Sequence, residues 1–235
     1  MTITEIMDQL KTMGSPQTAS MLAKHGAPEN MFGVKVADLK KILKRIKNDQ
    51  AMAEALFDTG NGDAMYLATL AADARKATPE LLTRWAESST WYMVNEYGIA
   101  GVAAEGPHGW SLGLTWIESD LEQVATTGWA TLAGVVAVAE DDELDHQAIS
   151  ALLDRVAEEL HRCPNRVRYT MNGFVIGVGC YVPALSAKAR QIGEQLGKVK
   201  VDMGGTACKV PSAPEYIDKV VQMGRLGKKR KTVRC

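Results

Sequence analysis

Two side chains near the middle of the chain are spaced so that they could form a chemical site. In the stretch SSTWYMVNEYG, Trp91 precedes Asn95 by four residues, and positions i and i+4 lie on the same face of an α-helix. An indole can pack against a ligand, and an amide can donate and accept hydrogen bonds. The pattern is also typical of a core, because Val94, Gly98 and Val102 share the face of Trp91 and aromatic residues at helical spacing usually pack. Both interpretations stay open at this point.

Two segments concentrate positive charge in a chain whose net charge is −1. Residues 35–47 carry six basic side chains and one acid, and residues 225–235 carry six and none. A solvated lysine face is a common reason for such a row, but a row this dense also suits DNA phosphates, whose binding weakens steeply with salt. The basic residues predicted to contact DNA are Lys35, Lys40, Lys41, Lys44, Arg45, Lys47, Lys228, Lys229, Arg230 and Lys231.

Composition excludes several other classes of function. Apolar residues make up 46% of the 235 residues and charged residues 23%, as in soluble globular proteins. The N-terminal stretch contains acids and no long apolar run, which predicts a cytoplasmic protein without a membrane span. Four cysteines and four histidines are scattered without metal-ligand spacing, and no phosphate-binding glycine loop occurs. We therefore expect neither a metal nor a cofactor.

Helical periodicity recurs along the chain, whereas the alternation of a β-strand is nearly absent. In residues 35–47 the apolar side chains follow one helical face. Helix starts are predicted at Ser15, Thr78, Asp145 and Ser212. Short helices joined by tight turns favour stacked antiparallel pairs, as in HEAT or armadillo arrays, with a compact α-bundle as the alternative. We predict one all-α solenoid domain over residues 1–224 and a basic tail over 225–235, and an irregular loop or short hairpin at 197–214.

Four stretches together resemble the bacterial DNA alkylation repair family: MFGVKVADLKKILKRIK, LFDTGNGDAMYLATLAAD, RWAESSTWYMVNEY and GRLGKKRKTVRC. The resemblance covers essentially the whole chain. It implies an α-α superhelix of HEAT-like helix pairs whose concave, basic surface holds duplex DNA. Active members of the family excise positively charged alkylated purines, and the family also includes orphan members of unproven activity. The partner that the resemblance implies is DNA, either duplex, alkylated or structurally distorted, bound by a monomer.

The family's catalytic pattern is a tryptophan followed one turn later by an aspartate, which stabilises developing positive charge and the attacking water. By resemblance, Trp91 matches the tryptophan, and Asn95 stands where the aspartate is expected. Trp129 lies in the segment where a phosphate-gripping arginine is expected, and Phe174 falls near a second aromatic position. A unit charge at about 4 Å is worth roughly 4 kcal/mol at an effective dielectric near 20, or about three decades in rate. Glu96 is adjacent, but a rotation of about 100° per residue predicts that it points away from the Trp91 face.

These observations predict a DNA-binding protein of the alkylation repair glycosylase superfamily that is weak or inactive as a glycosylase. It would bind duplex or distorted DNA through backbone and shape. One alternative is an active glycosylase that excises alkylated purines, with Asp63 or Asp73 reaching the cleft from a neighbouring helix. A second alternative is a scaffold of HEAT type that binds a protein partner. The sequence leaves open whether the two basic segments line one groove.

Overall fold

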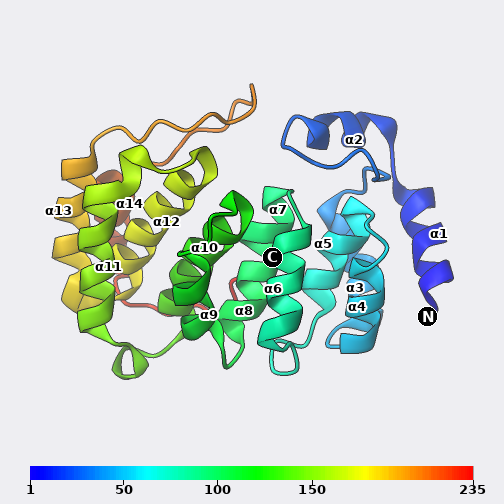
Figure 1. The fold of residues 1–235 in the computed structure, drawn as a ribbon, viewed down its shortest axis with the longest axis horizontal. Coiled ribbons are helices and arrows are strands. Elements are labelled where there is room, and N and C mark those ends of the chain that lie inside the picture. The colour runs from blue at the N-terminus through cyan, green and yellow to red at the C-terminus, as the bar shows by residue number, and fades with distance from the viewer. Residues whose placement is uncertain (235) are drawn as a thin grey trace.

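The computed structural model describes residues 1–234 as helices stacked side by side (Figure 1). No strand occurs in these residues. A π-helical turn (Asn95–Ile99) joins α7 to α8, and short 3-10 turns follow α10, α11 and α12. The helices are α1 (Ile3–Met13), α2 (Pro16–Ala23), α3 (Val36–Ile46), α4 (Gln50–Phe57), α5 (Gly62–Ala71), α6 (Pro79–Ser88), α7 (Tyr92–Val94), α8 (Ala100–Glu105), α9 (Gly109–Trp116), α10 (Glu122–Val138), α11 (His146–Glu159), α12 (Asn165–Tyr181), α13 (Ser186–Leu196) and α14 (Ala213–Gln222).

Six helices form a continuous row that we call the inner row. In this row α3, α5, α8, α10, α12 and α14 each pack against the next. The helices α4, α6, α9, α11 and α13 pack against the row and form a second layer. Figure 1 views the molecule from the side of α6 and α11, and the end of the chain passes behind them. The predicted all-α architecture of stacked helix pairs is therefore confirmed.

The helix starts follow the local sequence closely. Ser15, Thr78 and Asp145 each accept a backbone hydrogen bond from the first turn of the following helix, as predicted. Ser212 also precedes a helix, but its side chain makes no capping hydrogen bond. A proline in the first turn fixes the backbone there, so α14 begins at the predicted place without the predicted capping box.

The core runs the length of the stack. Buried apolar residues form two clusters, one within residues 6–124 and one within residues 117–217. Because α10 contributes to both clusters, the two halves share one packed helix. The amphipathic α3 buries Leu39, Ile42 and Ile46 and leaves its basic residues exposed.

The segment over residues 197–212 is irregular, in agreement with the sequence, and it lies at the end of the stack where α7, α10 and α12 begin (Figure 1). Its tip approaches the end of α2 closely: a Cβ atom added to Gly204 would lie 2.6 Å from the carbonyl oxygen of Lys24. We call this end of the molecule the upper end. The opposite end, where α5, α8, α10 and α12 terminate, is the lower end.

Residues 225–234, which we call the C-terminal strap, pack against the lower end instead of projecting as a free arm. The backbone N–H of Gly227 donates to Cys180 O at 2.9 Å, and that of Arg230 donates to Ala137 O at 2.8 Å. Residue 235, the last of the predicted basic tail, lies outside the described residues. The strap therefore runs from the end of α12 towards α10 and α8.

No single helix of residues 1–234 is long and apolar enough to cross a membrane, although the bent pair Asn165–Tyr181 and Pro183–Leu196 is long and apolar enough when the two helices are taken together. No group of three or more His, Cys, Asp and Glu side chains in these residues is arranged to hold a metal ion.

Candidate nucleic-acid interface

Five side chains at the upper end form what we call the upper cluster: Tyr92, Glu96, Tyr97, Arg166 and Tyr169. The Arg166 guanidinium donates from Nε to Glu96 Oε1 at 2.7 Å and from Nη2 to Oε2 at 2.5 Å. Its central carbon lies 4.3 Å from the ring centroid of Tyr92 and 4.3 Å from that of Tyr169. The arginine is thus held on both faces by aromatic rings, and at its end by a carboxylate.

Burial dominates the electrostatics of this cluster. The Glu96 side chain is only 2% exposed. Burial raises the pKa of Glu96 from 4.5 to about 7, although the hydrogen bonds and charge of Arg166 oppose the shift. Burial also raises the pKa of Tyr97. Both carboxylate oxygens of Glu96 face the guanidinium, so neither is free to face a developing positive charge.

A π-helical turn lies where Glu96 enters the upper cluster. Trp91 is the residue before the first turn of α7, and the helix continues as a π-turn over Asn95–Ile99, a form often found at functional sites. Glu96 follows Tyr92 by four residues and reaches Arg166. As the sequence predicts, Glu96 points away from Trp91 and Asn95, which lie in the core. The pair of an aromatic ring and an acid one turn apart is therefore Tyr92 and Glu96.

Trp91 and Asn95 lie in the core. Trp91 is 3% exposed, and its Nε1 donates to His25 O at 3.1 Å. Asn95 is 1% exposed, and its Nδ2 lies within hydrogen-bonding distance of Ala86 O and Thr127 Oγ1, at 3.1 Å each. The amide therefore ties α6 to α10. Of the two interpretations of this pair, the geometry favours the core.

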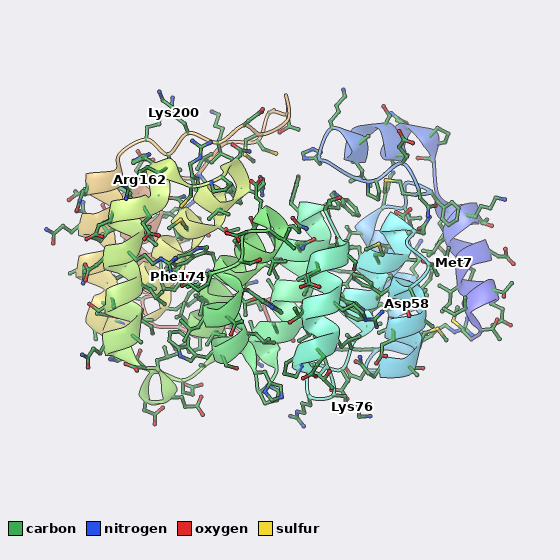
Figure 2. The ribbon with its side chains drawn as sticks, viewed as in Figure 1. Met7, Asp58, Lys76, Arg162, Phe174 and Lys200 are labelled. Atoms are coloured by element: carbon green, nitrogen blue, oxygen red, sulfur yellow. The ribbon has the colours of Figure 1, made fainter. Side chains whose placement is uncertain are left out.

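The other residues matched by resemblance are also internal. Phe174 has no exposed surface and packs edge-on against Trp129, with ring centroids 5.4 Å apart (Figure 2). It therefore cannot touch DNA bound to this conformation. Asp63 is buried and accepts hydrogen bonds from three successive backbone N–H groups of residues 32–34. Asp73 follows α5 at the lower end, so neither aspartate reaches the upper cluster.

The basic residues of α3 and of the strap approach each other at the lower end. Arg45 and Lys47 border a hollow at the turn after α3, together with Asn48 and Lys76. A neighbouring cavity of about 650 Å³ is also lined by Asn48, and by strap residues including Arg230. Its further lining residues include Arg75, Lys231, Arg234 and Glu105. The hollow at the end of α3 thus adjoins the strap's cavity through Asn48, but no basic residue of residues 35–47 lines that cavity.

The predicted DNA contacts differ in their surroundings. Lys41 pairs with Asp38 on the surface of α3, and Lys229 donates to Val136 O at 3.0 Å. The remaining basic residues are exposed: Lys35, Lys40, Lys44, Arg45, Lys47, Lys228, Arg230 and Lys231. Figure 2 shows that the upper end also carries cations, namely Arg162 and Lys200, whereas Lys76 lies at the lower end.

Sequence reasoning missed Arg166 and Tyr169, which complete the upper cluster. They lie in the stretch NRVRYTMNG at the start of α12, 70 residues beyond Glu96. The only local signal was two arginines and a tyrosine in the first turn of a helix. This signal is weak unless the partner of Arg166, Glu96, is already known.

A continuous inner row, backed by a second layer of helices and carrying an aromatic and cationic cluster, defines a helical-repeat protein of the HEAT-like class. Residues 6–195 match the family described as DNA alkylation repair enzyme. The chain therefore belongs to the DNA alkylation repair family.

Individual proteins similar to this chain agree with that assignment. Uncharacterised proteins of Listeria monocytogenes and Listeria innocua are 34% and 33% identical over 224 residues, which is 93% of this chain and 96% of each relative. A solved structure described as "a new family of proteins related to the HEAT-like repeat DNA glycosylases with affinity for branched DNA structures" is 32% identical, with a TM-score of 0.91 over 100% of both chains.

Proposed function

We propose that this protein binds branched DNA along its inner row and does not excise bases. The observation that carries the proposal is the state of Glu96. Its two oxygens are held by Arg166 at 2.7 and 2.5 Å, so the acid that follows an aromatic residue by one turn is already neutralised. At the position matched by resemblance to the catalytic aspartate, Asn95 supplies an uncharged, buried amide.

Two further observations support binding. The similar solved structure is described as having affinity for branched DNA. The upper cluster also presents partly exposed tyrosines, and Tyr97 is 40% exposed. Aromatic rings stack on unpaired bases, and the exposed cations Arg162 and Lys200 at the same end can attract phosphates. A branch point offers both unpaired bases and closely spaced phosphates, whereas an intact duplex keeps its bases stacked.

Gel-shift titrations at two salt concentrations test the binding. The probes are a three-way junction, a nicked duplex and an intact duplex of the same sequence. We expect the junction to bind most tightly, and Tyr97→Ala to weaken the junction more than the duplex. Lys11→Ala, on α1 away from the upper cluster, is the control. Absence of binding to every probe at low salt would contradict the proposal.

A second candidate function is base excision with Glu96 as the acid. It is favoured by one observation: the pKa of Glu96 is raised to about 7, where a general acid or base works best. Incubation with methylated duplex DNA, followed by measurement of released bases, separates the two functions. Our proposal predicts no release above a protein-free control. Release that disappears in Glu96→Gln while junction binding persists would establish excision instead.

A further inference from the structure

The lower end of the inner row is the end at which helix carbonyl groups are exposed. The last carbonyls of a helix have no partner within it and carry partial negative charge. Because α5, α8, α10 and α12 all terminate here, the bare edge would repel a phosphate. The strap places hydrogen-bond donors and positive charges over these carbonyls.

Donors from the strap reach the carbonyls at the ends of three inner helices. Arg234 Nη1 donates to the end of α5 at 2.7 and 3.2 Å. Lys229 Nζ and the backbone N–H of Arg230 donate to the end of α10 at 3.0 and 2.8 Å. The N–H of Gly227 reaches the end of α12. The acceptors are Thr69 O, Ala72 O, Val136 O, Ala137 O and Cys180 O.

The strap is seated in a space that Gly101 of α8 leaves open. A Cβ atom on Gly101 would lie 2.6 Å from Cγ of Arg234. Any larger residue at Gly101 would displace the arginine. The backbone that carries Arg230 and Lys231 is therefore fixed before any ligand arrives, which lowers the entropic cost of binding.

Both acids that line the lower cavity are already engaged. Glu105 accepts hydrogen bonds from Thr232 and from the backbone and side chain of Arg234. Asp73 accepts from the backbone N–H of Arg75 and pairs with Lys76 at 3.8 Å.

Three cations of the same cavity are exposed, namely Arg75, Arg230 and Lys231. The guanidinium of Arg230 also interacts with the hydroxyl of Tyr181. None of them forms an ion pair among residues 1–234. The lower edge, defined as Arg75, Arg230 and Lys231, is thus a fixed group of unpaired cations over helix ends.

The lower edge is far from the upper cluster. The helix α10 runs between the two ends over 17 residues, which is about 25 Å at 1.5 Å per residue. Neighbouring phosphates of one strand are much closer together than this. A ligand that uses both ends must therefore present phosphates about 25 Å apart, either along about seven base pairs of one duplex, at about 3.4 Å per base pair, or on two arms of a branch.

We propose that the lower edge is a second DNA-backbone site, which holds a different arm of a branched DNA from the arm at the upper cluster. The C-terminal strap creates this site by covering the helix ends and adding its own cations. The inference rests on the proposed function, and it assigns the contact with the second arm to the lower edge.

Hydroxyl-radical footprinting of a three-way junction, combined with a salt titration of its affinity, tests this inference. The variant is Arg75→Ala/Lys231→Ala, and the matched control is Lys11→Ala/Arg84→Ala, which removes the same charge from α1 and the outer helix α6. Both altered residues of the lower edge are exposed, so the unfolding temperature should equal that of the wild type.

We expect wild-type protein and control to protect phosphates on two arms, and the lower-edge variant to lose protection on one arm only. The slope of log affinity against log salt should fall by about two, one for each phosphate that the variant no longer neutralises. The variant Arg75→Lys/Lys231→Arg should restore both. If the alanine variant gives the same footprints and the same salt slope as the wild type, this inference is wrong but the proposed function stands. If the wild type binds no DNA, the proposed function is wrong as well.

Discussion

The upper and lower ends each contain one glutamate paired with one arginine from a distant part of the chain, yet the pKa values of the two glutamates are shifted in opposite directions. Glu96 has its pKa raised to about 7, because burial outweighs the single partner, Arg166. At Glu105 burial also acts to raise the pKa, but the hydrogen bond from Thr232, the charge of Arg234 and the N–H of Val233 together lower it. The Glu96 side chain is 2% exposed and that of Glu105 is 16% exposed, so the balance between burial and the number of donors decides the direction of the pKa shift.

This difference suggests different roles for the two pairs. Glu96 is an acid held in an apolar setting beside exposed tyrosines, where a ligand can alter its surroundings. Glu105 is saturated by donors and fixes the strap. Substitutions at the two pairs test this contrast.

Arg166→Ala should lower the free energy of unfolding most, by about 3–5 kcal/mol, because it leaves a buried carboxylate without its partner. The Glu96 side chain is 2% exposed and that of Arg166 is 18% exposed. Urea denaturation measures the change. Arg84→Ala is the control, since its ion pair with Asp58 is exposed on both sides and should contribute less than about 1 kcal/mol. If the two variants lose similar free energy of unfolding, the buried pair of Glu96 and Arg166 contributes no more than an exposed ion pair.

Glu96→Gln should change how stability depends on pH. The folded pKa of about 7 lies above the unfolded value of 4.5, so between these pH values the folded chain holds a proton that the unfolded chain has released. The free energy of unfolding of the wild type, measured relative to Glu96→Gln, should therefore fall as pH rises from 4.5 to 7. The fall should be at most about 3 kcal/mol. A rise over that range would mean that Arg166 outweighs burial.

Arg234→Ala should lower the free energy of unfolding by about 2 kcal/mol, the value of hydrogen bonds to charged groups. The loss should be smaller than for Arg166→Ala, because Glu105 keeps Thr232 and the N–H of Val233 as donors. Lys228→Ala is the control in the same strap, since Lys228 is exposed. Equal stability of the two variants would show that the strap is not anchored by its arginine.

Glu105→Gln should give the smallest effect and the opposite sign with pH. Because the folded pKa of Glu105 is lowered, its contribution to stability is present above the ordinary value of 4.5 and is lost as pH falls through the folded pKa. Wild type and variant should therefore converge in stability in acid. Parallel pH profiles for the two glutamate variants would show that the two ends do not differ as described.

Much of the fold could be predicted from the sequence, because its signals are local. The apolar stripe of α3 and the capping residues Ser15, Thr78 and Asp145 specify helices through contacts within a few residues. The stacking of short antiparallel helices follows from the tight turns between them. Only at Ser212 is the predicted capping hydrogen bond missing, and there the proline in the first turn is enough to start the helix.

The candidate site was harder to predict, because it depends on register and on distant partners. The matched residues Trp91 and Asn95 lie in the core, and the acid of the upper cluster is the adjacent Glu96. Its partner Arg166 lies 70 residues away, and no local pattern links the two. The charge of residues 225–235 marked them as important, but only the fold shows that Lys229 and Arg234 are used internally.

The C-terminal strap also affects how the chain can fold. Stacked helical repeats ordinarily contact only their neighbours, so that folding can start anywhere and spread. Here Arg234 bonds to Thr69, 165 residues earlier in the chain, and such a contact closes a very long loop. The contact between α5 and the strap can therefore form only after Arg234 has been synthesised. Unfolding should accordingly be more cooperative across the whole stack than in an array without such a closure.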